Sequence, residues 1–275
     1  IHHDRQYRRR EDVDVPGAFY HQVAEGRFES SPLTAGPWSP DSQHAGPPSA
    51  LLVRAMERFE RRPGVRLSRV SVDVLGPVPV ADLEIEVRTV RPGRSVELLE
   101  ATASAGGRPA LVARGWRMRS TPEDFPVHGD HTGPEVPNAP RERGAMMSFA
   151  YADGYLSVVD FSFDHGDGDA LGPARAWGRS RLDLLEGESM TGWQHTILVA
   201  DSASGISLAT DPLTHPAVNC DLVVSLHREP EPGWVHLDSE TVGGPGRGVI
   251  TDTLLSDDRG RIGRSVQNLY GRRAG

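Results

Sequence analysis

The sequence predicts an α+β fold made of two similar halves, each with one helix and an antiparallel sheet. Three observations support this prediction. An apolar helical segment at residues 49–59 is followed by four strand-like segments. A second apolar helix near residues 191–201 is again followed by strand-like segments, and short motifs recur at a constant spacing. A helix followed by a meander of strands is typical of a sheet that wraps around the helix.

The first half follows a polar arm at residues 1–16. Residues 19–28 are expected to form a short helix, and a proline-rich loop then leads into Gly46-Pro47-Pro48. Prolines suit the first turn of a helix, and apolar side chains recur at helical spacing over residues 49–59. Turns with glycine or proline separate the strand-like segments that follow, which are residues 69–75, 83–90, 95–104 and 109–119.

A proline-rich segment then interrupts the pattern, and its lack of apolar periodicity predicts a linker. Strand-like residues 155–163 and 174–182 lie between it and the second helix. Further strands are expected at residues 218–226, 234–242, 248–255 and 261–270. The predicted organisation is therefore an N-terminal arm at 1–16, a first half at 17–120, a linker at 121–147 and a second half at 148–275.

An internal repeat connects the two halves. Gly93-Arg94 parallels Gly246-Arg247, Gly107-Arg108 parallels Gly260-Arg261, and Arg119 parallels Arg272, always 153 residues apart. Agreement of separate segments in one register indicates a duplicated unit, and the period is too long for a solenoid. The two sheets are therefore expected to lie side by side and to join into one.

Composition excludes several classes of function. The net charge of −8 argues against a nucleic-acid partner and against attraction to an anionic membrane. No run of eighteen apolar residues exists and the start of the chain lacks an apolar signal core, so a cytoplasmic protein is expected. The single cysteine, Cys220, cannot form an internal disulfide, and its alternation with Val218 and Leu222 predicts a buried core thiol.

The sequence contains no lysine, so all 30 basic residues are arginine. Lysine Schiff-base chemistry and a Walker-type phosphate site are thereby excluded. Any bound phosphate must be held by arginine, by backbone amides or by a helix N-terminus. No metal or redox cofactor is expected, because the linker residues His128, His131 and Glu135 have no second group of ligands.

One ionisable residue stands out within the second apolar helix. Asp201 follows Ile197 by four residues and Leu198 by three, so it touches the apolar face. A buried carboxylate costs several kcal/mol unless it is partnered, which makes Asp201 a candidate site residue.

Several short motifs occur in an order that resembles one known family. They are Gly36-Pro37-Trp38, Gln43-His44-Ala45-Gly46-Pro47-Pro48, Asn219-Cys220-Asp221-Leu222, Leu226-His227-Arg228 and Val266-Gln267. With these motifs, residues 18–273 resemble the acyl-CoA thioesterase II type and its actinobacterial thioesterase-like relatives. The resemblance implies a double hotdog fold and hydrolysis of an acyl thioester, either of CoA or of an acyl carrier protein, by an activated water.

The resemblance also implies a site. In the family, an aspartate on the second helix, a Ser or Thr on the next strand and a glutamine on the last strand orient the water. These positions fall on Asp201, Asn219 and Gln267, so the middle one departs from the pattern. Strand alternation would turn Asn219 away from the helix unless a bulge intervenes. His44 and Gly46, in the loop before the first helix, are expected to contact the substrate.

Two other functions stay open at this point. A double hotdog protein that binds acyl thioesters without turnover is one, because Asn219 replaces a hydroxyl. A hotdog hydratase or dehydratase is the other, although His44 lacks the His-x-x-x-Gly spacing of such enzymes. A serine hydrolase is disfavoured because no Gly-x-Ser-x-Gly elbow is present. The duplicated chain also leaves formation of a homo-oligomer open.

Overall fold

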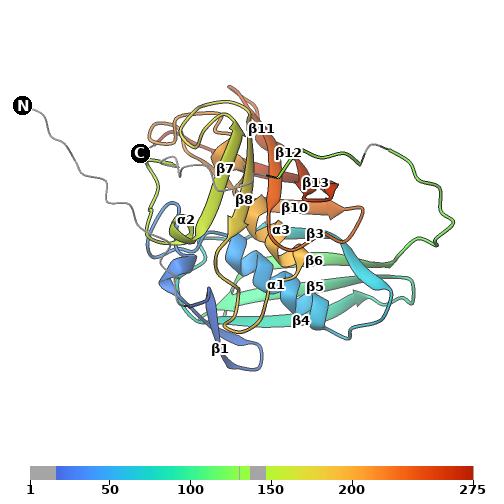
Figure 1. The fold of residues 1–275 in the computed structure, drawn as a ribbon. Helices are drawn as coiled ribbons and strands as arrows, with labels where there is room; N and C mark the ends of the chain where they lie inside the picture. Colours follow the sequence, from blue (N-terminus) through green and yellow to red (C-terminus); the bar gives the residue numbers. More distant parts are fainter. Residues whose placement is uncertain (1–16, 130, 137–146, 275) are drawn as a thin grey trace, which may run out of the picture.

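The computed structural model describes residues 17–129, 131–136 and 147–274. Within these residues, thirteen strands form one antiparallel sheet, and helices α1 and α3 lie side by side across one face of it (Figure 1). The predicted arm at 1–16 lies outside the described residues, as do residue 130 and residues 137–146 of the predicted linker. The predicted α+β fold is confirmed, with its two sheets joined into one.

The first half packs helix α1 (Gly46–Arg58) onto four long strands. These strands are β3 (Val65–Val74), β4 (Leu83–Arg91), β5 (Val96–Ala105) and β6 (Arg108–Arg119). Pro47 and Pro48 occupy the first turn of α1, where the missing N–H groups cost little. The side chains of Leu51, Leu52 and Met56 on α1 are fully buried, as the helical spacing predicts.

The second half packs helix α3 (Gly192–Ala200) onto its own strands. They are β7 (Val159–His165), β8 (Ala174–Ser180), β9 (Ala217–Asn219), β10 (Asp221–Leu226), β11 (Val235–Val242), β12 (Val249–Asp257) and β13 (Gly260–Gly271). The Thr191 side chain caps α3 by accepting a hydrogen bond from the Gln194 N–H. Two short helices, α2 (Tyr155–Val158) and α4 (Ala203–Ile206), flank the site described below.

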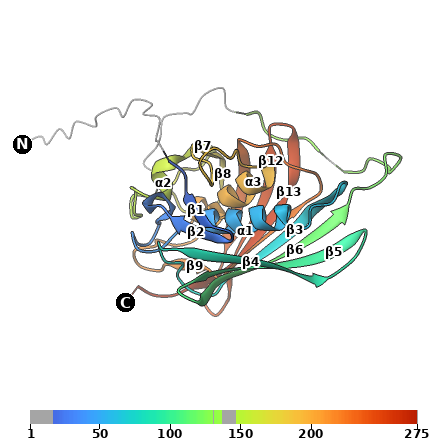
Figure 2. The ribbon, with the colours of Figure 1, turned by 90° about the horizontal axis from the view of Figure 1, so that it is seen from below.

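The strand order shows how the two halves meet. It reads β1-β2-β4-β5-β6-β3 through the first half and β10-β13-β12-β11-β8-β7 through the second, so one half mirrors the other around the β3–β10 pair. Strand β10 pairs with β3 from Asp221 opposite Asp73 to Ser225 opposite Arg69. In Figure 2 the strands of both halves curve around α1 and α3.

Three local predictions were wrong. Residues 19–28 do not form a helix but belong to a hairpin of β1 (Tyr20–Ala24) and β2 (Arg27–Ser30). The hairpin forms because Gly26, with φ of 68°, supplies the turn and Phe28 pairs with Leu83 at the sheet edge. Residues 155–158 form a helical turn before β7 instead of the start of a strand.

The third correction concerns Cys220, which is exposed instead of buried. The expected strand at 218–226 is divided into β9 and β10 at this residue. Between the pairs Asn219–Leu269 and Val223–Val266, three residues on this strand oppose two on β13. This β-bulge breaks the side-chain alternation, so the thiol leaves the core.

Candidate active site

The candidate site is centred on the carboxylate of Asp201, at the end of α3. The sequence suggested that Asp201 lies inside the helix. In the structure the helix ends at Ala200, and Asp201 is its C-cap residue. The residue is only 6% exposed. A negative charge at a helix C-terminus is disfavoured by about 0.3–1 kcal/mol. This carboxylate therefore requires partners from elsewhere in the chain.

His44 supplies the first partner from the loop before α1. Its Nδ1 lies 2.9 Å from Asp201 Oδ2, and both side chains are buried. The Gly46 main-chain N lies 3.1 Å from the same Nδ1. One ring nitrogen cannot both donate and accept, and a carboxylate is the stronger acceptor. We therefore assign the proton to Nδ1, which donates to Asp201.

Asn219 supplies the second partner from strand β9. Its Nδ2 donates to Asp201 Oδ1 over 2.7 Å. The bulge at Cys220 allows this contact, because the alternation of an unbroken strand would turn the Asn219 side chain away from α3. Each carboxylate oxygen of Asp201 thus receives one N–H, from segments 175 residues apart in the sequence (219 − 44 = 175).

Gln267, on strand β13, holds the backbone around Asp201. Its Nε2 donates to the Asp201 main-chain oxygen over 3.2 Å and lies 3.5 Å from Oδ1, while its Oε1 accepts the Ser204 N–H over 3.1 Å. The longer distance is at the limit of a hydrogen bond. Gln267 therefore positions the turn between α3 and α4 more than it contacts the carboxylate.

Tyr155 supports His44 from the other side. The two rings stack with centroids 3.8 Å apart and an interplanar angle of 10°. The phenol donates to the Leu198 main-chain oxygen over 3.0 Å and lies 3.0 Å from Ser202 Oγ. Burial, and to a lesser degree the Asp201 carboxylate, raise the pKa of Tyr155 well above its usual value. The phenol therefore remains a donor.

Gly46 begins α1 and has a structural role. A Cβ atom on this residue would lie 2.4 Å from the Leu198 main-chain oxygen. Only glycine allows α1 to approach the end of α3 this closely, and this approach brings His44 to Asp201.

Asp201, His44 and Asn219 line a cavity of about 890 Å³. Its wall is mainly apolar and comes from both halves; it includes Trp38, Val74, Val78, Phe149, Leu208 and Val218. Trp38 and Phe149 contact each other with ring centroids 5.8 Å apart. Gly46 and Gln267 are not among the residues that line the cavity. A concave apolar cavity with a few converging polar groups is typical of a small-molecule site.

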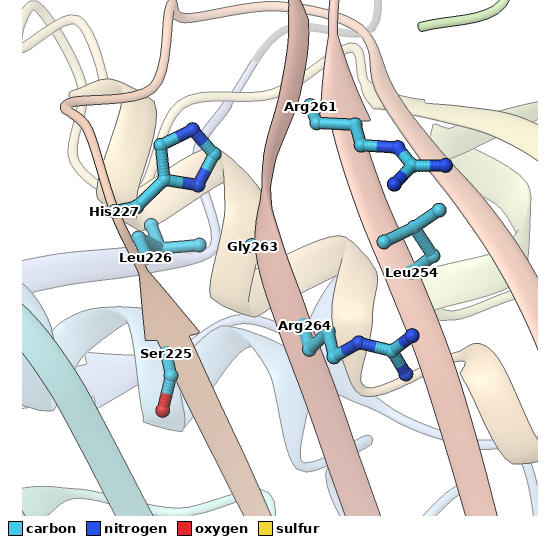
Figure 3. A pocket seen from close by; sticks show the side chains of 7 residues that line it. All are labelled: Ser225, Leu226, His227, Leu254, Arg261, Gly263 and Arg264. Carbon is cyan, nitrogen blue, oxygen red and sulfur yellow. The ribbon is translucent and has the colours of Figure 1, made fainter. Parts of the chain in front are cut away.

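A second hollow, of about 450 Å³, lies on strands β10, β12 and β13 (Figure 3). Its lining includes Ser225, His227, Arg261 and Arg264, and it shares no residue with the cavity at Asp201. The hollow is open and contains no carboxylate, so it lacks a group that could serve as a base. The cavity at Asp201 is therefore the candidate active site.

Comparison with protein families decides the identity of the fold. A sequence model of the acyl-CoA thioesterase N-terminal domain matches residues 34–118, and one of the C-terminal domain matches residues 122–270. The chain belongs to the acyl-CoA thioesterase family. It is accordingly a thioester hydrolase with a double hotdog fold. No curated protein sequence matches the chain significantly.

Solved structures agree on the fold. A putative thioesterase from Novosphingobium aromaticivorans superposes with a TM-score of 0.71 at 18% identity, covering 94% of this chain and 99% of its own. A putative thioesterase II from Thermobifida fusca gives 0.67 at 21% identity, with 93% and 95% covered. An acyl-CoA thioesterase II from Mycobacterium marinum gives 0.65 at 13% identity, with the same coverage.

The structure thus brings four of the five predicted site residues together around one carboxylate, while Gly46 packs behind them. Tyr155 and Ser202 belong to the same cluster but were not predicted. No sequence signal could have found them, because Tyr155 reaches His44 only through folding across 111 residues (155 − 44 = 111). Among the described residues, no group of three or more His, Cys, Asp or Glu side chains is arranged to hold a metal. No described helix is long and apolar enough to cross a membrane.

Proposed function

We propose that this protein hydrolyses acyl-CoA thioesters with a water molecule that the Asp201 carboxylate orients and deprotonates. The observation that carries the proposal is a buried carboxylate on the cavity wall, fixed by one N–H donor on each oxygen. Fixed donors leave the carboxylate little freedom to rotate, so its remaining lone pairs point in set directions. Such preorganisation favours a base that must hold one water.

In the proposed mechanism, water attacks the thioester carbonyl carbon and passes its proton to Asp201. A tetrahedral oxyanion forms and then collapses, the carbon–sulfur bond breaks, and the proton leaves with the thiol. Throughout these steps His44 and Asn219 donate hydrogen bonds to the carboxylate. Tyr155 supports the His44 ring, and Gln267 supports the Asp201 main chain.

The developing oxyanion requires N–H or O–H donors that face the cavity. Asn219 uses one N–H of its amide on Asp201, and the second can donate to the substrate carbonyl. Ala45, the N-cap residue of α1, also lines the cavity, so main-chain N–H groups at the start of this helix are a second source. An amide can thus perform the donor role that a hydroxyl performs in the family pattern.

The cavity favours an uncharged aliphatic acyl group. Exposed apolar side chains, among them Trp38, Leu75, Leu213 and Tyr270, contribute to its lining. The described lining residues include one acidic side chain, Asp201, and one arginine, Arg272. A second carboxylate on the acyl group, placed near Asp201, would be disfavoured by repulsion between like charges.

The direct test measures free thiol release from acyl-CoAs of increasing chain length by the parent protein and by Asp201→Asn. We expect hydrolysis by the parent and a fall in kcat of roughly 10²- to 10⁴-fold in the variant, because the base is lost. Asp238→Asn, a matched change at an exposed carboxylate on β11, should leave kcat unchanged.

Binding separates this proposal from a non-catalytic acyl carrier. Asp201→Asn should still bind a non-hydrolysable S-alkyl-CoA thioether with an affinity close to that of the parent. A parent protein that binds the thioether but releases no thiol from any acyl-CoA or acyl carrier protein thioester would contradict the proposed activity.

A further inference from the structure

Among the described residues that line the cavity at Asp201, Arg272 is the arginine. It follows the last residue of β13 and is exposed at the end of the strand. Among the described residues it forms no ion pair; one guanidinium nitrogen donates to the Arg273 main-chain oxygen over 3.3 Å. A guanidinium carries five N–H donors, so most of them face solvent or the cavity.

Main-chain hydrogen bonds fix the position of the Arg272 backbone, from which the guanidinium extends. The Arg272 N–H donates to the Pro216 main-chain oxygen over 3.1 Å, and the Ala274 N–H donates to the Thr214 oxygen over 2.8 Å. Pro216, Ala217 and Ala274 line the same cavity. Figure 2 shows the C-terminal end of the chain close to β9, the strand that carries Asn219.

Strand β13 gives the approximate separation between Arg272 and Gln267. Gln267, which contacts Asp201, lies on β13 five residues before Arg272, the residue that directly follows this strand. At about 3.3 Å per residue, the two Cα atoms lie about 17 Å apart. This separation is comparable to the extended length of a phosphopantetheine arm, from its sulfur to its phosphate.

We propose that Arg272 binds the phosphate of the phosphopantetheine arm when the thioester carbonyl lies at Asp201. The inference rests on the proposed function and adds the recognition of the thiol carrier. CoA and acyl carrier protein share this phosphate, and in a chain without lysine the cationic side chain that can bind it through several N–H donors is arginine. Arginine binds phosphate through paired N–H donors. The acyl chain then occupies the apolar part of the cavity.

The test compares Arg272→Gln with the parent on substrates that share one acyl group but differ in the carrier: acyl-pantetheine, acyl-4′-phosphopantetheine, acyl-CoA and acyl carrier protein. We expect kcat/KM to fall roughly tenfold on the three carriers with the phosphate, as for loss of a charged hydrogen bond, and less than about twofold on acyl-pantetheine. Arg272→Lys should show a smaller fall in kcat/KM than Arg272→Gln, because lysine retains the positive charge. Arg273→Gln, the neighbouring exposed arginine, should behave like the parent.

Binding of S-alkyl thioethers of pantetheine, phosphopantetheine and CoA to the same variants provides a readout that does not need turnover. An equal loss with and without phosphate would overturn the proposal, because Arg272 would then be structural. A loss confined to CoA would assign Arg272 to the nucleotide phosphates instead, which also overturns it. Failure of the proposed activity appears separately, as absent thiol release by the parent.

Discussion

At the residue scale, the candidate site depends on two N–H donors that fix one buried carboxylate. Asp201 receives His44 Nδ1–H on one oxygen and Asn219 Nδ2–H on the other. Neither donor comes from α3, the helix that Asp201 caps, so each partner can be replaced without altering this helix. A buried carboxylate that loses one donor keeps its desolvation cost and loses its fixed orientation.

Replacing Asn219 tests this role. We expect Asn219→Ala to lower kcat roughly tenfold to hundredfold, because one donor to Asp201 and one donor for the oxyanion are lost together. Asn219→Thr should retain more activity than alanine, since a hydroxyl can also donate to the carboxylate. Steady-state kinetics on the preferred acyl-CoA measures both. Asn268→Ala, at an exposed asparagine on β13, is the control; equal kinetics for Asn219→Ala and the control would contradict the assignment.

At the element scale, the bulge between β9 and β10 has two consequences. It turns Asn219 toward α3, and it places Cys220 at the cavity with its side chain exposed. The Cys220 N–H donates to the Asn268 main-chain oxygen over 2.8 Å, while the Asp221 carboxylate accepts the Asn268 N–H over 2.7 Å. The Asp221 side chain therefore replaces a main-chain acceptor in the hydrogen-bond ladder between this strand and β13, which the bulge interrupts.

The exposed thiol can be tested directly, since Cys220 is the single cysteine of the sequence. We expect a thiol reagent to modify the native protein at a rate similar to that of the urea-unfolded protein, and a bound S-alkyl-CoA thioether to slow the reaction. A thiol that reacts only after unfolding would restore the buried assignment. Cys220→Ser should change the free energy of unfolding by less than about 0.5 kcal/mol, as is usual for an exposed position.

At the scale of the whole molecule, contacts across the two halves form one unit. Arg54 on α1 pairs with Glu188 over 2.7 Å, and the Trp193 indole on α3 donates to the Leu67 main-chain oxygen over 3.1 Å. The cavity also takes its wall from both halves. The boundaries predicted at residues 120 and 148 stay a prediction, but neither half contains a complete site.

Three histidines of the second half are expected to make global stability depend on pH: His236 is buried, His195 is partly buried and His227 is exposed. Burial lowers the pKa of His195 to about 4, and burial also lowers the pKa values of His227 and His236. Between pH 6.5 and 4 the unfolded chain binds a proton at His195 that the native protein does not bind. The free energy of unfolding therefore falls as the pH drops through this window, by up to about 3 kcal/mol for His195.

Urea denaturation at several pH values between 7 and 4 measures this dependence. His195→Asn should flatten the decline by about that amount relative to the parent, because asparagine does not titrate. His215→Asn, at an exposed histidine, should leave the slope unchanged. Parallel curves for the parent and His195→Asn would show that this residue does not contribute.

The sequence by itself determined the fold class, both long helices and most strands, and it singled out Asp201 and Gln267 as candidate site residues. Apolar periodicity and turn residues act over a few neighbours, so they are readable from a single chain. The hairpin at β1 and β2 was missed because its strands are defined by pairing with β4, not by their own pattern.

Tertiary structure alone decided the orientation of Asn219, the exposure of Cys220 and the stack of Tyr155 on His44. The bulge arises from the register between β13 and two strands that pair with it, and strand alternation cannot contain that information. The meeting of His44 with Asp201 likewise requires the crossing of α1 and α3 at Gly46. Long-range packing sets these contacts, because the segments that form them have no local preference for one another.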